Sequence, residues 1–254
     1  MGRPINLKSS AEIDKMLEAN QIVAGTLAML EDRIRPGVTT LQLDEWAEDY
    51  ARQHAAIPAF KGYRGFPGSL CVSLNEEVVH GIPTAAAVLK EGDIVSIDFG
   101  VKHKDFYGDA AVTLAVGKIS ARKRKLIDVT RQALELAIEQ ARVGNRINDL
   151  GRAVQRHVER NGFSVVRQFV GHGIGSQLHE APEIPNYERN EPSPRLIAGM
   201  ALAIEPMVNA GSYEVEVMKD GWTVLTRDRK PSAHFEHTVV VTDGAPLVLS
   251  RWRG

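Results

Sequence analysis

Two aspartates, Asp98 and Asp109, lie in short runs whose spacing would bring their carboxylates close together. In residues 93–100 the apolar side chains fall on alternate positions, which is the period of a half-buried strand. A turn centred between His103 and Lys104 pairs this run with residues 107–110, and Asp98 then lies directly opposite Asp109, with Cβ atoms about 5 Å apart. Opposed carboxylates repel each other unless one is protonated or a cation lies between them. The pattern predicts a metal site or, alternatively, a surface hairpin whose aspartates point into water.

A second copy of this unit is indicated by residues that recur 107 positions later. The pairs are Gly37 and Gly144, Leu43 and Leu150, Leu89 and Leu196, Gly92 and Gly199, and Asp98 and Glu205. The order helix, Arg-x-Gly turn, helix, loop and strand recurs as well. We therefore expect one domain over residues 1–254, with similar halves at about 9–115 and 120–248. Residues 196–205 should form the strand equivalent to that of Asp98, and residues 234–241, which contain Glu236, should form its partner.

Helical periodicity supplies the elements that must position these strands. Ser9-Ser10-Ala11-Glu12 is a capping box, and apolar residues at helical spacing follow it to about Arg33. Further helices are expected from residues 39–42 to about His54, from Ser120 towards Gly144, and over residues 147–160. The Gly-, Pro- and aromatic-rich segment 58–83 should be a loop that contains one strand, residues 70–74.

The duplicated hairpins would bring Asp98, Asp109, Glu205 and Glu236 to one central cavity, where four acids need cations. A histidine, His172, lies between the hairpins in Gly171-His172-Gly173-Ile174-Gly175, where glycines allow the backbone to approach closely. This pentapeptide could instead cradle a phosphate, although no Lys-Ser/Thr follows it. Four carboxylates and one imidazole suit a pair of bridged divalent ions roughly 3.5–4 Å apart, such as Mn, Fe, Co or Zn.

Composition limits the remaining classes of function. The 254 residues include 31 Lys and Arg against 32 Asp and Glu, for a net charge of −1, so no polyelectrolyte signature for nucleic acid or anionic membrane is present. One cysteine, Cys71, excludes an internal disulfide. The N-terminal residues lack the apolar core of a signal peptide, and no apolar run of about 18 residues occurs. We expect a cytoplasmic protein that does not span a membrane.

Several motifs together resemble one known family over about residues 9–248. They are His80-Gly81-Ile82-Pro83, residues 93–98, Gly108-Asp109, residues 171–175, His179-Glu180, Ile204-Glu205-Pro206-Met207 and Glu236-His237-Thr238. The chain is similar to the type I methionine aminopeptidases of the pita-bread (creatinase/aminopeptidase) fold. The resemblance implies an α+β architecture in which an internally duplicated antiparallel sheet carries two helix pairs on its outer face.

The resemblance also implies roles for the candidate site. Two divalent ions (Co, Mn, Fe or Zn) would be held by Asp98, Asp109, His172, Glu205 and Glu236, with Asp109 and Glu236 as bridges. Glu205 would accept the proton of the attacking water, His179 would stabilise the oxyanion, and His80 would contact the scissile amide. Taken alone, either histidine could simply hold a loop. His237 is expected to support the ligands, whereas His54, His103 and His157 are expected to be surface or packing residues.

The expected substrate pocket follows the same family. Tyr63, Phe66, Cys71 and Trp222 match family pocket positions, and Phe60 and Leu178 stand where bacterial members often carry Cys and Phe. An apolar, aromatic-lined slot would suit a methionine thioether, although such residues are also ordinary core.

The implied activity is removal of the N-terminal methionine from nascent proteins and peptides with a small second residue, by a metal-bridged hydroxide that attacks the first peptide bond. The alternatives are an Xaa-Pro peptidase and a non-catalytic binding protein of the same fold. The expected partners are peptide substrates and the ribosome surface, with no nucleic-acid motif, and the expected state is a monomer.

Overall fold

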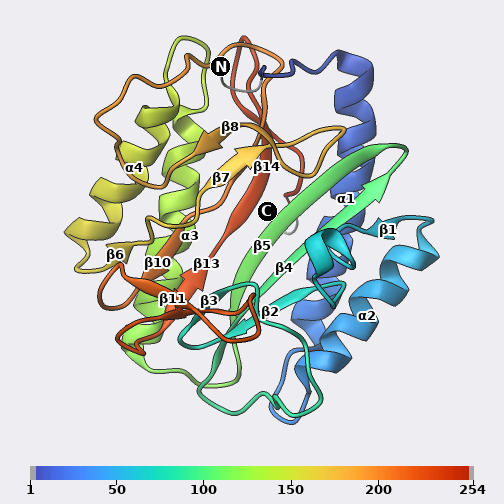
Figure 1. Ribbon diagram of the computed structural model, residues 1–254, viewed down its shortest axis with the longest axis vertical. Helices are drawn as coiled ribbons and strands as arrows, with labels where there is room; N and C mark the ends of the chain where they lie inside the picture. Colours follow the sequence, from blue (N-terminus) through green and yellow to red (C-terminus); the bar gives the residue numbers. More distant parts are fainter. Residues whose placement is uncertain (1–3, 252–254) are drawn as a thin grey trace.

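The computed structural model describes residues 4–251, which fold into four α-helices, a main antiparallel sheet and two small sheets (Figure 1). The helices are α1 (Ser10–Arg33), α2 (Thr40–Gln53), α3 (Ala121–Gln140) and α4 (Ile147–Arg160). In Figure 1, α1 and α2 lie at the right of the view and α3 and α4 at the left, one pair beside each half of the sheet. All four expected helices are present, and the predicted α+β class is confirmed.

Capping explains where the first helix begins. The Ser9 hydroxyl accepts from the Glu12 backbone N–H at 3.4 Å, and the Glu12 carboxylate accepts from the Ser9 backbone N–H at 2.8 Å. This reciprocal pair satisfies two N–H groups that the helix leaves without an intrahelical partner. From there α1 packs across β4 (Ile94–His103) and β5 (Phe106–Ala115).

The main sheet runs in the order β1-β4-β5-β14-β9-β7-β8, with β2 beside β4 and β15 beside β14. Two small sheets, β13-β10-β6 and β11-β12-β3, complete the fold. The remaining bounds are β1 Ile57–Pro58, the 3₁₀ turn η1 Tyr63–Gly65, β2 Cys71–Leu74, β3 Glu77–Val79, β6 Ser164–Val165, β7 Gly171–Gly173, β8 Glu180–Ile184, β9 Ala201–Ile204, β10 Met207–Asn209, β11 Val215–Val217, β12 Val224–Thr226, β13 Ser232–His234, β14 Glu236–Val240 and β15 Leu247–Val248.

The β4–β5 hairpin forms as expected, but its predicted register is wrong. Asp98 lies opposite Ala111, and Asp109 lies opposite Gly100. The two aspartates are therefore diagonal neighbours on one face, not directly opposed. The cause is the turn: His103 pairs with Phe106, so the connection is Lys104-Asp105, one residue later than the sequence suggested.

Both turn residues adopt positive φ, 47° at Lys104 and 67° at Asp105, as in a two-residue type I′ turn. The twist of this turn type matches that of the strands it joins, so turn geometry fixes the register without help from a bound ion.

This geometry gives a test of stability. Asp105→Gly should raise the free energy of unfolding by about 0.4–1 kcal/mol, because glycine adopts positive φ without strain and the exposed Lys102–Asp105 ion pair at 3.4 Å contributes little. Thermal unfolding should shift upward by about 2–4 °C per kcal/mol. Asp105→Ala, which keeps the strained backbone, is the matched control, and equal melting temperatures for the two variants would refute the explanation.

One face of the sheet packs on the helices and the other carries the acids. Ile97, Phe99 and Val101 of β4 are fully buried and join Leu27 of α1 in the main core. Asp98, between them in sequence, points to the opposite face because strand side chains alternate. The alternation read from the sequence thus separates the core from the site.

Pairing across three strands aligns the acids in one row. Ala111 of β5 lies opposite Asp98 on one side and Glu236 of β14 on the other. Ala203 of β9 lies opposite Thr238 of β14, two residues after Glu236, and His172 of β7 lies opposite the same Ala203. Because paired residues share a face, Asp98, Glu236 and His172 all project from the side of the sheet away from the core.

Two strands of the second half are shorter than expected. The predicted strand 196–205 is reduced to β9, because a turn with Gly199 at φ 89° precedes it, and Glu205 follows directly after the strand. The predicted strand 234–241 divides at Phe235 into β13, which pairs with β10, and β14, which pairs with β5 and β9.

Equivalent contacts recur between the two halves at the spacing of 107 residues. The Gly37 N–H donates to Leu89 O at 2.9 Å, and the Gly144 N–H donates to Leu196 O at 3.1 Å. Both glycines have similar positive φ, 92° and 93°. The isolated bridge from Thr39 to Val88 likewise recurs at Arg146 and Arg195. We infer that residues 9–115 and 120–248 are copies of one unit.

Candidate active site

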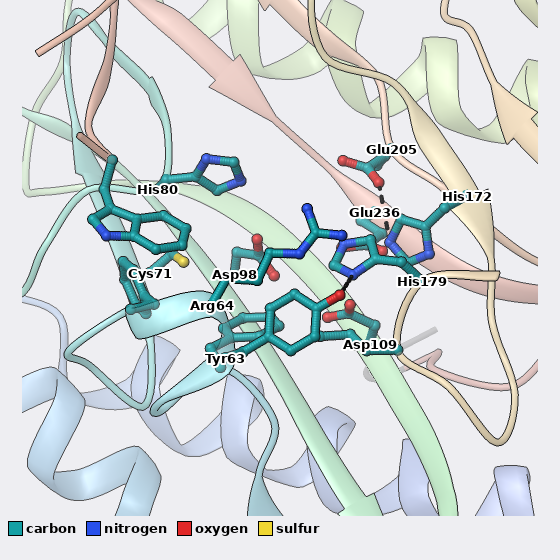
Figure 2. A pocket seen from close by; sticks show the side chains of 14 residues that line it. Tyr63, Arg64, Cys71, His80, Asp98, Asp109, His172, His179, Glu205 and Glu236 are labelled. Atoms are coloured by element: carbon teal, nitrogen blue, oxygen red, sulfur yellow. Dashed lines mark hydrogen bonds and ion pairs between the residues drawn. The ribbon is translucent and has the colours of Figure 1, made fainter.

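A cavity of about 150 Å³ opens on the face of the sheet away from the helices. Figure 2 shows its lining side chains. All thirteen residues that the sequence nominated for metal or substrate contact line it, together with Arg64: Phe60, Tyr63, Phe66, Cys71, His80, Asp98, Asp109, His172, Leu178, His179, Glu205, Trp222 and Glu236. The structure thus brings the nominated residues together, and their individual roles remain proposals.

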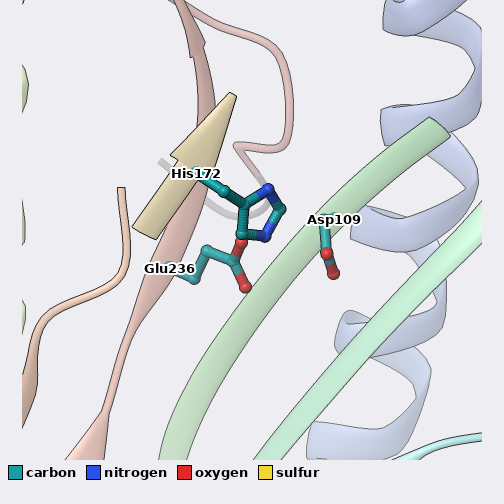
Figure 3. Close-up of side chains that lie close together, drawn as sticks. All are labelled: Asp109, His172 and Glu236. Atoms are coloured by element: carbon teal, nitrogen blue, oxygen red, sulfur yellow. The ribbon is translucent and has the colours of Figure 1, made fainter. Parts of the chain in front are cut away.

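Three side chains from three strands converge most closely. Asp109, His172 and Glu236 each offer a ligand atom within 4.8 Å of the others, and they come from β5, β7 and β14 (Figure 3). Asp98 and Glu205 line the same cavity. Carboxylate oxygens with one imidazole are a donor set for divalent ions such as Mn, Fe, Co or Zn.

Glycines make room for this arrangement. A Cβ on Gly171 would lie 2.4 Å from Ala203 O, and one on Gly173 would lie 2.1 Å from Ala181 O. A Cβ on Gly100, opposite Asp109, would lie 3.1 Å from Asp109 Oδ1. Any side chain at the first two positions would push the His172 strand away from its neighbours, which is the close approach expected from the sequence.

A hydrogen bond to a backbone carbonyl fixes the tautomer of His172. Its Nδ1 lies 2.9 Å from Gly173 O, so Nδ1 carries the proton and donates to that carbonyl. Nε2 then presents a lone pair to the cavity, 3.5 Å from Glu205 Oε1. A backbone carbonyl bonded to the far nitrogen is the usual support of a metal-binding histidine.

The carboxylates are strongly perturbed. Burial, followed by the charge of Glu205, raises the pKa of Asp98 to about 7, and burial raises the pKa of Glu205 to about 7. Burial and neighbouring acids raise the pKa values of Asp109 and Glu236 well above the ordinary range. Among the described residues, buried oxygens without hydrogen-bond partners include Asp98 Oδ1, Asp109 Oδ1 and Glu236 Oε1. Such orphaned acceptors are costly, and a divalent cation would satisfy them.

These shifts predict how ion binding depends on pH. Because the pKa values of Asp98 and Glu205 are raised to about 7, both groups are mostly protonated at lower pH and the ion must displace their protons. Mn²⁺ affinity, measured by calorimetry, should therefore fall steeply between about pH 8 and about pH 6, by at least ~100-fold, because Asp98 and Glu205 contribute about 10-fold each and the raised pKa values of Asp109 and Glu236 add to the loss. Equal affinity at the two pH values would show that the carboxyls ionise normally.

Two neutral histidines flank the acids. His179 Nδ1 lies 2.8 Å from the Tyr63 hydroxyl, and burial, then His172, lowers the pKa of His179 to about 3. Burial, then His234, lowers the pKa of His80 to about 4. Both rings are therefore uncharged near neutral pH, and each has one N–H to donate.

An aromatic wall closes the other end of the cavity. Phe66 packs edge-on against Trp222 at 5.2 Å between ring centroids, and His80 approaches the same indole at 6.2 Å. Cys71 lies opposite Asp98 in the β2–β4 pair, where burial raises the pKa of its thiol, so it is an apolar wall residue and not a nucleophile. The cavity thus joins an acidic end to an apolar end.

The loop that carries His179 is anchored by a buried ion pair. Lys8 Nζ lies 2.6 Å from Glu180 Oε2, with both side chains 4% exposed, and Glu180 Oε1 accepts from the Gln177 N–H at 3.1 Å. The segment before α1 therefore holds the turn before β8.

Lys8→Met should lower the free energy of unfolding in urea by about 3–5 kcal/mol, because it leaves a buried carboxylate unpaired. The double variant Lys8→Met with Glu180→Met should recover much of that loss. A loss of less than about 1 kcal/mol in the free energy of unfolding, as expected for a surface ion pair, would contradict the burial of Lys8 and Glu180.

The expectation for His237 is wrong. Its Nδ1 lies 2.9 Å from the Ser250 hydroxyl, and it lines a different hollow, beside Glu135 and Arg251, because it is adjacent to Glu236 and strand side chains alternate. The imidazoles of His54, His103 and His157 lie outside the cavity lining, as expected.

Two residues near the acids were missed by sequence reasoning. Arg64 lines the cavity at φ 49°, with its guanidinium 5.4 Å from the Tyr63 ring centroid. Its position between Tyr63 and Gly65, in the glycine-rich loop, was the available signal. His234 is 1% exposed and lies 3.7 Å from Glu205, but in the sequence it looked like one more residue of a strand.

Comparison with known proteins identifies the family. The model of metallopeptidase family M24 matches residues 14–243. This chain belongs to metallopeptidase family M24. The M24 assignment implies use of a divalent metal, in agreement with the buried donor set.

Similar proteins within the M24 family span almost the whole chain. A methionine aminopeptidase of Clostridium perfringens is 52% identical over 97% of this chain and 98% of its own length, and methionine aminopeptidase 1 of Bacillus subtilis is 50% identical over 96% and 98%. The crystal structure of a methionine aminopeptidase from Thermotoga maritima superposes with a TM-score of 0.96 at 44% identity, covering 98% of this chain and 100% of that one.

A prolidase of Pyrococcus horikoshii shares the M24 fold at a TM-score of 0.79 and 20% identity, with 97% of this chain matching 64% of that one. The expected pita-bread fold is confirmed. No helix within the described residues is both long and apolar enough to span a membrane.

Proposed function

We propose that the protein is a metal-dependent methionine aminopeptidase that removes N-terminal methionine from peptides with a small second residue. The observation that carries the proposal is a single cavity with buried, orphaned carboxylates at one end and an aromatic slot at the other. An aminopeptidase needs both parts, since the first side chain must be held while the adjacent amide is hydrolysed. The similarity to the methionine aminopeptidases of Clostridium perfringens and Bacillus subtilis supports the same activity.

Five side chains would hold the metal: Asp98, Asp109, His172, Glu205 and Glu236. We propose that these residues would hold two ions drawn from Co, Mn, Fe and Zn, with Asp109, His172 and Glu236, which offer ligand atoms within 4.8 Å of one another, at the centre of the site. When bound, such ions lower the pKa of a coordinated water and polarise the scissile carbonyl.

We assign proton transfer to Glu205. Its carboxylate lies at the cavity wall, and a pKa raised to about 7 by burial is close to the value that suits a group exchanging protons near neutral pH. One oxygen of Glu205 would take the proton of the attacking water and deliver it to the leaving amine, so that the group ends the cycle ionised, as it began.

His179 is suited to stabilise the oxyanion. If the Tyr63 O–H donates to Nδ1, the neutral ring keeps its proton on Nε2, which can donate to the carbonyl oxygen as negative charge develops. His80, also neutral, would contact the scissile amide from the side of the aromatic wall.

The slot for methionine would be formed by Tyr63, Phe66, Cys71 and Trp222, with Phe60 and Leu178 reshaping its rim relative to other bacterial members. Thioether sulfur makes favourable contacts with aromatic ring edges, and a flexible unbranched chain fits between rings. We further propose that the protein acts as a single-domain monomer in the cytoplasm, on nascent chains at the ribosome surface.

The test compares peptides at equal concentration with Co, Mn, Fe or Zn supplied separately. Met-Ala-Ser, Leu-Ala-Ser, Phe-Ala-Ser and an Xaa-Pro peptide are incubated with the protein, and released amino acids are quantified by chromatography. Met-Ala-Ser should be cleaved at least about 10-fold faster than Leu-Ala-Ser, because a matched apolar pocket discriminates by roughly 1–3 kcal/mol.

Each other outcome overturns a part of the proposal. Equal cleavage of the Leu or Phe peptide would refute methionine preference, and faster cleavage of the Xaa-Pro peptide would indicate a proline-specific peptidase. No cleavage with any ion would indicate a non-catalytic binding protein.

A further inference from the structure

His234 is a buried imidazole that the proposed mechanism does not use. It ends β13, two residues before Glu236, and is 1% exposed. Neither ring nitrogen has a hydrogen-bond partner, which makes it one of the buried side chains with orphaned polar atoms. Leaving such a group unpaired in the interior is unfavourable, so we expect a small rearrangement to give the imidazole a partner.

The backbone of His234 is clamped in place. Its N–H donates to the Thr113 hydroxyl at 2.8 Å, and the same hydroxyl donates to its carbonyl at 2.8 Å. Ser96 Oγ lies 2.8 Å from the Thr113 hydroxyl, which ties β4, β5 and β13 together at this point. The backbone of His234 is therefore held firmly, whereas its two ring nitrogens have no hydrogen-bond partner among the described residues.

The ring faces the acidic end of the site. Nε2 lies 3.7 Å from Glu205 Oε2, just beyond hydrogen-bond distance, and the ring interacts electrostatically with Asp98 and His80. The other oxygen of Glu205, Oε1, lies 3.5 Å from His172 Nε2. Glu205 thus stands between two imidazoles, one of which is a proposed ligand.

We propose that His234 is a positioning residue for Glu205, donating Nε2–H to Oε2 and leaving Oε1 to share a cation with His172. A small shift of the Glu205 carboxylate on ion binding would close the 3.7 Å gap. Ligating carboxylates are commonly oriented by such outer donors, whose loss weakens metal binding by about 10–100-fold. This inference rests on the proposed function, because it requires that Glu205 be a ligand.

The experiment measures Mn²⁺ binding to metal-free protein by calorimetry, without peptide. The variants are His234→Gln, whose amide N–H reaches the place of Nε2, His234→Asn, whose amide occupies the place of Nδ1, and apolar His234→Leu. Gln should bind like the parent, whereas Asn and Leu should bind about 10–100-fold more weakly. The Co²⁺ absorption spectrum of His234→Gln should match that of the parent, because no direct ligand is lost.

Other outcomes overturn the proposal in distinguishable ways. Equal Mn²⁺ affinity in all variants would show that His234 only packs. If Gln binds as weakly as Leu and its Co²⁺ spectrum changes, His234 is a direct ligand. If the parent binds no Mn²⁺, the proposed function fails together with this inference. The comparison of Gln with Asn remains informative even if His234→Leu does not fold.

Discussion

Replacing Asp109 with alanine should abolish stable divalent-ion binding and lower kcat/KM on Met-Ala-Ser by at least about 10³-fold, since metal ions supply several kcal/mol of transition-state stabilisation. Asp109 is 3% exposed and belongs to the tightest group of donors, with His172 and Glu236. If Asp109 contacts both ions, its removal should weaken the binding of both. Metal content by mass spectrometry and steady-state kinetics with added Mn²⁺ are the two measurements.

The fold of the metal-free variant should survive this change. Burial and the neighbouring acids raise the pKa of Asp109, because a charged carboxylate is unfavourable at this position in the metal-free protein. Asp109→Asn removes the ionisable group and keeps the shape of the side chain. Asp109→Asn is therefore the variant that separates loss of metal from loss of structure. Asp105→Ala, in the exposed turn of the same hairpin, should keep full metal content and activity. An Asp109 variant that retains metal content and activity would contradict the assigned site.

The second large effect is expected at His179. His179→Ala should lower kcat and kcat/KM together, by about 10²–10³-fold, because an oxyanion donor acts mainly in the transition state. Tyr63→Phe should cause a smaller loss, since it removes only the bond that orients the ring. Metal content should not change in either variant. A raised KM with unchanged kcat would show that His179 binds the ground state instead.

The pH dependence separates this role from an acid–base role. Burial and then the charge of His172 lower the pKa of His179 to about 3, so the ring is mostly neutral between about pH 5.5 and about pH 8. The ratio of parent to variant kcat should then be constant between about pH 5.5 and about pH 8. A ratio that falls as the pH is lowered would mean that His179 is protonated in this range. His54→Ala, at the end of α2 and outside the cavity, is the control that should leave kcat unchanged.

Alternation and periodicity predicted much of this molecule. The capping box at Ser9 and the apolar spacing after it give α1, and the alternation around Asp98 separates core from site. The repeat at 107 residues pointed to the pairing of β9 with β14, which the structure contains. The first two patterns reflect contacts within one helix or one hairpin, and the repeat carries the pairing of the first hairpin over to the second half.

Features that depend on distant contacts or on unusual turn chemistry were not predicted. Lys104 and Asp105 form a two-residue turn without Gly or Asn, so no residue type marks its centre, and the predicted register was wrong. The strand after Ser232 breaks at Phe235 because its two parts pair in different sheets. Strand alternation places His234 on the same face as Glu236, two residues later, but its approach to Glu205 at 3.7 Å depends on contacts between distant strands.

The central claim is that five side chains form a dinuclear metal centre, and diffraction tests it most directly. Crystals of the protein equilibrated with Mn²⁺ are measured at the manganese absorption edge. The account predicts two anomalous peaks between Asp98, Asp109, His172, Glu205 and Glu236, with Asp109 and Glu236 contacting both. No peak in the cavity, or a single peak that leaves Asp98 or Glu205 without an ion, would contradict it.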